Sequence, residues 1–225
     1  MIARNYIFAK ASNYGSLYFF IQYTQKNMKT IKAYLIIAAL LMIGLTGFTQ
    51  EVDMTKGDLS VLKGETSINF EFTYEKMGVG DFNKEADYIK KKIEEQNAKD
   101  PPNGDKWATE WEDQKKNYFG DKFILGFTKQ NKLTYSKDAK YTLIFNTKAL
   151  EPGYQVGVSK RNAGVDGTVT LVESAKRDKK IAVLFVERAP ETKWRGAAFD
   201  AKSRIGDAYY MDGQKVGKFI EKNIK

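Results

Sequence analysis

Apolar and polar residues alternate along several short stretches of this chain, and each such stretch predicts a β-strand with one buried face. The clearest alternation runs over 67–74, where isoleucine, phenylalanine and tyrosine take every second position. Similar patterns predict strands at 141–145 and 165–172, and a short first strand at 59–62. The run 181–186 is apolar at every position, so we expect it in the centre of the sheet.

Other parts of the chain carry apolar residues at helical spacing. Over 82–93 these residues fall on one face and predict a helix, which Pro101 and Pro102 must end. A second helix is expected from Asp105 onward, and the two antiparallel helices should form a hairpin that covers one face of the sheet. A last helix is predicted from about 201 to 223. Its buried residues should be Ile205, Tyr209, Val216, Phe219 and Ile220.

Turn signals separate the strands and complete the predicted fold. Glu151-Pro152-Gly153-Tyr154 has Pro followed by Gly, the order that a type II turn requires, and the charged run 176–180 predicts an exposed hairpin turn. The elements then follow the order β-β-α-α-β-β-β-α. The sequence therefore predicts one α+β domain of two layers, in which a mostly antiparallel sheet of about five strands carries the helical hairpin and the C-terminal helix.

The first fifty residues contain no Asp or Glu. Within them, Met28 opens a short basic start with Lys29 and Lys32, and an apolar run follows at 33–48. That run has 16 residues, whereas a helix that spans a bilayer needs about 20. The pattern predicts a secretory signal peptide at 28–49, with an uncleaved membrane anchor as the alternative.

We expect cleavage after Thr49, so that Gln50 begins the mature protein, within about three residues. Residues 1–27 precede a complete signal, and we interpret them as a start codon placed too early or as an extended leader. The chain has no cysteine, which excludes lipid attachment at a cleavage-site cysteine. The expected product is a periplasmic or secreted domain at 50–225 that has no stable membrane span.

The net charge of the whole chain is +9, but the leader accounts for much of it. Residues 1–50 contain five basic residues and no acidic ones. Residues 51–225 contain 32 basic and 28 acidic residues, which leaves a net charge of +4. Nucleic-acid binders concentrate positive charge in a dense patch or stripe. We therefore do not expect a nucleic-acid partner.

Cysteine and histidine are both absent. An exported domain without cysteine cannot be held together by disulfides, so its stability must come from core burial. Histidine is the commonest general base and the commonest metal ligand, and its absence argues against zinc hydrolases and Ser-His-Asp or Cys-His enzymes. We predict no catalytic residues, no metal site and no cofactor.

Trp107 and Trp111 lie on one face of the predicted second helix. They can be interpreted as a sugar or lipid platform, or as a core contact between helix and sheet, which is the commoner use of aromatic residues at helical spacing. Carboxylates are frequent on both predicted helices, and a glycosidase needs two of them about 5 to 10 Å apart across a cleft. Sequence alone does not show such a pairing.

One resemblance emerges from three motifs. They are 104–107 followed by Trp111, Glu151-Pro152-Gly153 followed by a Gly-Val strand, and 204–209. Together they resemble an uncharacterised family of exported proteins from Bacteroidota over most of 57–223. The resemblance implies an envelope location and a small α+β fold, and it carries no assigned activity. The C-terminal strand–hairpin–strand–helix is also similar to periplasmic accessory domains of envelope-assembly machines, which is an analogy of fold alone.

The sequence therefore predicts an exported, non-enzymatic protein of the cell envelope with a binding or accessory role. Its partner should be an envelope protein or a glycan. Two alternatives remain open, a carboxylate-based glycan hydrolase and a periplasmic carrier of a small molecule or lipid. The residues proposed for interaction are Trp107, Trp111, Tyr154, Lys176 and Arg177.

Overall fold

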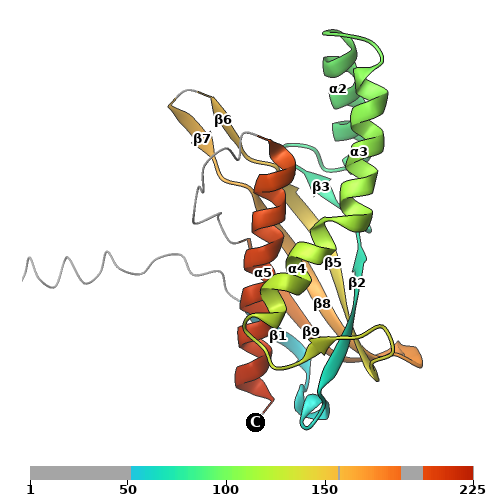
Figure 1. The fold of residues 1–225 in the computed structure, drawn as a ribbon, viewed down its shortest axis with the longest axis vertical. Helices are drawn as coiled ribbons and strands as arrows, with labels where there is room; N and C mark the ends of the chain where they lie inside the picture. The colour runs from blue at the N-terminus through green and yellow to red at the C-terminus, as the bar shows by residue number, and fades with distance from the viewer. Residues whose placement is uncertain (1–51, 157, 189–199, 225) are drawn as a thin grey trace, which may run out of the picture. The chain divides into compact units, whose positions relative to one another are not determined.

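The computed structural model describes residues 52–156, 158–188 and 200–224 (Figure 1). The chain divides into two units between residues 49 and 50, and the second, Gln50–Lys225, contains all the described residues. The predicted leader, including Met28, Lys29, Lys32, Thr49 and Gln50, lies outside the described residues. The hydrophobic core described below is built entirely from residues of the second unit. That unit therefore has its own core, as an independently folding domain requires.

The second unit is built on a mixed sheet of seven strands in the described part of the chain. Its order is β1-β9-β8-β5-β2-β4, and β3 pairs with β5 beyond the end of β2. The long ladders β1–β9, β8–β9 and β5–β8 are antiparallel, whereas β2, β3 and β4 make parallel pairs. The strands are β1 (Val52–Gly57), β2 (Ser67–Thr73), β3 (Gly78–Val79), β4 (Thr134–Tyr135), β5 (Tyr141–Glu151), β8 (Gly164–Glu173) and β9 (Lys176–Val186).

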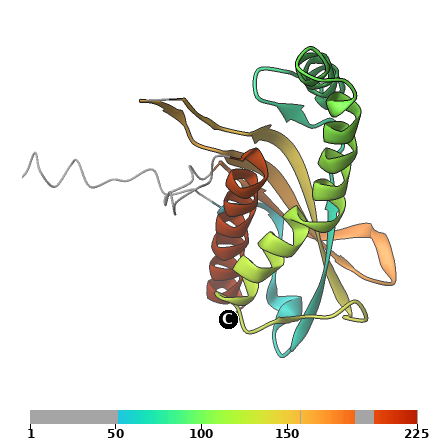
Figure 2. The same ribbon diagram turned by 45° about the horizontal axis from the view of Figure 1, so that its top comes forward.

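The helices form a second layer on one side of this sheet, which confirms the predicted α+β class (Figures 1 and 2). They are α2 (Glu85–Asn97), α3 (Asn103–Asn117), α4 (Phe119–Thr128) and α5 (Ala201–Asn223). Helices α4 and α5 pack on each other and on the sheet. The hairpin of α2 and α3 forms as predicted, but it packs mainly on itself and extends past the end of the sheet. The face of the sheet that it was expected to cover is covered by α4 and α5.

The predicted first strand at 59–62 is wrong. Residues Ser60–Leu62 form a short 3-10 helix, η1, in which Leu62 is buried. The Asp58 carboxylate accepts hydrogen bonds from the backbone N–H and the hydroxyl of Ser60, both at 2.7 Å. Such local side-chain bonds compete with a strand ladder and favour a turn. The strand that does precede β2 is β1.

The charged run 176–180 is not a turn. It forms the exposed first half of β9, and the turn itself lies at Ser174 and Ala175. The apolar run 181–186 is the second half of β9, which lies between β1 and β8 rather than at the centre of the sheet. Only one of its faces is covered, since Ala182 and Leu184 are buried while Phe185 stays 39 % exposed on the other side.

Aromatic side chains fill the space between the helices and the sheet. Phe119 of α4 stacks on Tyr209 of α5, with ring centroids 5.2 Å apart, and Phe123 packs against Phe145 of β5 at 4.9 Å. The Tyr209 hydroxyl is fully buried and shares a 2.6 Å hydrogen bond with Thr147. Of the core residues predicted for the last helix, four are buried and Phe219 is half-buried. The predicted limits and buried face of that helix are confirmed.

Candidate functional site

The two tryptophans lie inside the α2–α3 hairpin. Trp111 is 3 % exposed, and its ring stacks on that of Trp107 with centroids 5.6 Å apart and planes inclined by 20°. Tyr88 of α2 packs edge-on against Trp107 at 5.8 Å and contacts Trp111 as well. Their partner is therefore α2, not the sheet. This cluster supplies the apolar core of a hairpin that the sheet does not cover.

A nearly buried lysine on α3, Lys115, joins the two helices of this hairpin through an ion pair. The Lys115 ammonium lies 2.6 Å from the Glu85 carboxylate and 2.9 Å from that of Glu112. Glu85 also accepts a 2.6 Å hydrogen bond from the Trp111 indole N–H. Tyr74, which directly follows β2, connects the hairpin to the sheet, because its hydroxyl donates to the Lys115 carbonyl oxygen at 2.7 Å. Burial raises the pKa of that tyrosine. The Glu85 carboxylate thus links α2 to α3, whereas the Glu112 carboxylate pairs with Lys115 within α3.

Lys176 and Arg177 lie on the exposed half of β9, where acidic residues of the sheet bind them. The Lys176 ammonium lies 3.5 Å from the Glu173 carboxylate. The Arg177 guanidinium pairs with Glu71 of β2 and donates to the Ser174 carbonyl oxygen at 3.1 Å. Both side chains remain partly exposed, but their charges are matched within the molecule. This weakens them as a site for an anionic ligand.

Tyr154 begins a two-stranded hairpin that projects from the sheet, formed by β6 (Tyr154–Val156) and β7 (Ser159–Arg161). We call the described residues 154–156 and 158–161 the arm. Figures 1 and 2 show the arm standing away from the helices at the end of the sheet where α5 begins. Its large apolar side chains lie in solvent. Tyr154 is 42 % exposed, Val156 is 71 % exposed and Val158 is completely exposed.

The root of the arm is built around Glu151, whose side chain is nearly buried. Its carboxylate accepts a 3.0 Å hydrogen bond from the Gly153 N–H and a 3.1 Å bond from the Arg161 guanidinium. Arg161 in turn lies over the Tyr154 ring, 5.9 Å from its centroid. Gly153 has φ +65°, and a Cβ there would lie 2.6 Å from the Ala163 nitrogen. Only glycine fits this turn.

Arg204 fixes the same root from the opposite side. This arginine lies in the first turns of α5 and is 7 % exposed. It donates to the carbonyl oxygen of Pro152 at 3.2 Å and to that of Gly153 at 3.0 Å. The start of α5 is itself capped, because the Asp200 carboxylate accepts a 2.7 Å hydrogen bond from the Ser203 N–H. Burial acts to raise the pKa of Asp200, but these hydrogen bonds outweigh it and leave the pKa lowered.

The α2–α3 hairpin reaches the same end of the molecule. Burial raises the pKa of Tyr88 to about 12, and the negative charges of Glu95 and Glu151 act in the same direction. The positive charge of Arg204 opposes them. The charges of Glu151 and Arg204 thus act in opposite directions on this tyrosine. Three parts that are distant in sequence, namely α2, the end of β5 and the start of α5, together form this end of the domain.

Two of the three sequence motifs noted above meet at the arm root. Glu151-Pro152-Gly153 supplies the turn, and Arg204 from the motif 204–209 supplies its donors. Neither Glu151 nor Arg204 was among the residues predicted to be functional. The sequence does carry one signal for Arg204. It directly precedes Ile205, the first buried residue predicted for the last helix, and a charged side chain at such a place requires a partner.

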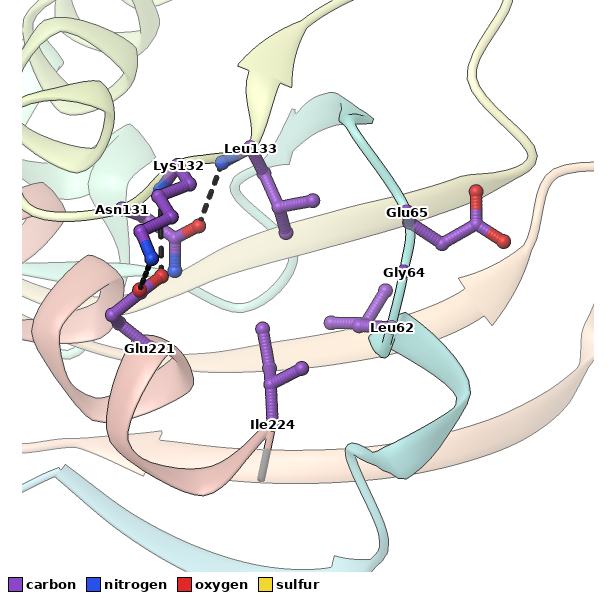
Figure 3. A pocket seen from close by; sticks show the side chains of 8 residues that line it. All are labelled: Leu62, Gly64, Glu65, Asn131, Lys132, Leu133, Glu221 and Ile224. Atoms are coloured by element: carbon purple, nitrogen blue, oxygen red, sulfur yellow. Dashed lines mark hydrogen bonds and ion pairs between the residues drawn. The ribbon is translucent and has the colours of Figure 1, made fainter.

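A pocket of about 260 Å³ lies where the C-terminal end of α5 approaches η1 (Figure 3). Leu62, Leu133 and Ile224 line it together with two carboxylates. The Glu221 carboxylate lies 3.6 Å from the Lys132 ammonium, while Glu65 points away from the pocket and pairs with Lys140 at 3.5 Å. The two carboxylates thus do not face each other. The volume is also below that of typical ligand sites, about 300–1,000 Å³.

The described residues contain no group of three or more Asp or Glu side chains placed to hold a metal ion. None of the described helices is long and apolar enough to cross a bilayer.

Comparison with known proteins gives little more. No family model matches the chain, and no curated protein matches it. Among solved structures, the chain is similar to the PelC dodecamer from Paraburkholderia phytofirmans, with a TM-score of 0.34 and 11 % identity, over 72 % of this chain and 97 % of that one. A point variant of the same dodecamer gives a TM-score of 0.32 over the same shares. At these values neither likeness bears on function.

Proposed function

We propose that this chain is an exported, non-enzymatic protein of the cell envelope that binds an envelope component through the arm. The signal-peptide pattern at 28–49 supports export, and the resemblance to an exported family of Bacteroidota agrees with it. The observation that carries the binding role is the arm itself. Tyr154, Val156 and Val158 stand in solvent on a hairpin whose root is held by buried charged groups.

The energetics of the arm favour binding. Burying a valine side chain stabilises a fold or a complex by about 1.5–3 kcal/mol. Val156 and Val158 are exposed in the free protein, so this stabilisation can arise only when a partner covers them. Ordering a loop on binding costs free energy, and a preformed hairpin avoids most of that cost. Glu151 and Arg204 hold the root in one conformation. The arm thus presents exposed apolar surface in a fixed conformation.

The two alternatives have less support. A hydrolase needs paired carboxylates in a cleft, and in the described pocket Glu65 and Glu221 point apart and each has a lysine partner. A carrier needs an apolar cavity between helices and sheet. In the described part of the domain Phe119, Phe123 and Tyr209 pack tightly in that space.

Photo-crosslinking in the native host tests this proposal. Benzoylphenylalanine placed at position 158 should give a discrete adduct with an envelope component. The matched control is the same residue at position 179, since Lys179 is exposed on β9 at a distance from the arm. We expect no adduct there. Equal labelling from both positions, or none from position 158, would contradict a binding role for the arm.

A further inference from the structure

Side chains change character in a fixed order along the arm. The tip carries Val156 and Val158, which are the most exposed large apolar residues in the described part of the chain. Tyr154 and Arg161 form the next level, paired across the two strands, and Lys160 lies exposed beside them. Acidic groups lie at the root, where the carboxylates of Glu151 and of the exposed Asp81 lie 3.1 and 3.6 Å from the Arg161 guanidinium. With increasing distance from the tip, the side chains are thus first aliphatic, then aromatic and basic, and finally acidic.

This order matches the layers of a lipid surface. Aliphatic side chains gain free energy at the level of the acyl chains. Tyrosine is suited to the headgroup level because it has an apolar ring and a polar end. Lysine is favoured at that level as well, since its stem lies along apolar surface while its charge reaches phosphate. On the arm this lysine is Lys160, because the Arg161 charge is already paired with Glu151 and Asp81. Acidic groups are favoured in the water beyond the headgroups, and the root of the arm would lie there.

We propose that the arm inserts its tip into a lipid surface and so attaches the domain peripherally to a membrane. This inference rests on the proposed function and names the partner class of the same site. A protruding tip suits a soft, flat partner, and it needs no matching cavity. The charge order described above favours lipid over a protein groove, in which no such layering is required.

The binding expected from this geometry is weak and reversible. Two valines bury much less apolar surface than a single acyl chain, which by itself gives only marginal attachment. The contribution of Lys160 should appear only with anionic lipid, because it depends on attraction to phosphate. Binding should therefore depend steeply on the two valines and modestly on this lysine.

Sedimentation with vesicles of phosphatidylethanolamine and phosphatidylglycerol tests the inference. The fragment 50–225 is used, because it contains the whole described core and lacks the apolar run 33–48. Val156→Ser combined with Val158→Ser should lower vesicle binding at least about tenfold. The matched control is Leu125→Gln, which removes a 49 % exposed apolar side chain from α4 and should leave binding unchanged.

A second variant separates the charge contribution. Lys160→Ser should weaken binding about fivefold on vesicles with phosphatidylglycerol and have no effect on vesicles without it. All four altered side chains are exposed, so each variant should keep the urea midpoint of the unchanged fragment. That midpoint is measured alongside.

Two results would overturn the lipid inference. One is the absence of vesicle binding by the unchanged fragment, and the other is an equal loss from the arm variant and Leu125→Gln. If position 158 still crosslinks to an envelope protein in cells, the binding role stands and only the lipid surface is rejected. If vesicle binding and crosslinking both fail, the binding role of the arm falls with it.

Discussion

Replacing Gly213 by alanine is expected to lower the free energy of unfolding by about 3 kcal/mol or more. Helices α4 and α5 approach each other so closely at this point that a Cβ on Gly213 would lie 2.0 Å from the Phe123 carbonyl oxygen. Gly126 on α4 makes the reciprocal approach, 2.0 Å from the Tyr210 carbonyl oxygen. Both obstacles are helix backbone, so the extra methyl group must force the two helices apart. The higher helix propensity of alanine returns only about 1 kcal/mol.

Urea denaturation of the fragment 50–225 measures this effect. The matched control is Gly206→Ala in the same helix. A Cβ on Gly206 would lie 2.7 Å from an edge atom of the Tyr118 ring, which can turn aside. We expect that variant to change the free energy of unfolding by less than about 1 kcal/mol. Equal losses of stability from the two variants would show that the close approach of α4 and α5 is not the reason why position 213 requires glycine.

Replacing Arg204 by methionine should lower the free energy of unfolding by about 2–4 kcal/mol. It should also leave the root of the arm without the contacts that fix its conformation. The change keeps much of the apolar stem and removes the guanidinium that donates to the carbonyl oxygens of Pro152 and Gly153. Hydrogen bonds from charged groups contribute about 1.5–3 kcal/mol each, and the two carbonyls would lose these donors in a largely buried place. Amide hydrogen exchange at Tyr154 and Arg161 should become faster, because their strand pairing depends on this root.

The matched control for Arg204 is Lys202→Met, the same kind of change two residues earlier. Lys202 is exposed and its ammonium lies over the Tyr118 ring, 4.7 Å from the centroid. Its loss should cost less than about 1 kcal/mol and leave exchange in the arm unchanged. If the two variants behaved alike, the arm would not be held by Arg204.

Local patterns predicted those elements whose burial follows directly from their periodicity. The last helix and the strands at β2 and β8 are examples, because their apolar residues face the core at regular intervals. The patterns failed where a few residues decided the outcome. Asp58 binds Ser60 and turns the chain at η1. The strands β3 and β4 have two residues each, too few to show alternation.

The candidate site was less predictable than the fold. Tyr154 was proposed from sequence, and it lies on the arm with an exposed ring. The groups that fix the arm are Glu151 and Arg204, and the latter bonds carbonyl groups 51 and 52 residues away along the chain. No local pattern reports such a pairing. For the two tryptophans the predicted partner was wrong. Their spacing indicated a contact with the sheet, whereas their rings pack against Tyr88 of α2.

Export is tested most directly by N-terminal sequencing of the protein recovered from its native host. The sequence pattern at 28–49 predicts a signal peptide, and the proposed envelope role depends on its removal. We expect a mature protein that begins at Gln50, within about three residues, and that is recovered outside the cytoplasm. A protein that still begins at Met1 and stays in the cytoplasm would contradict export and the envelope role together.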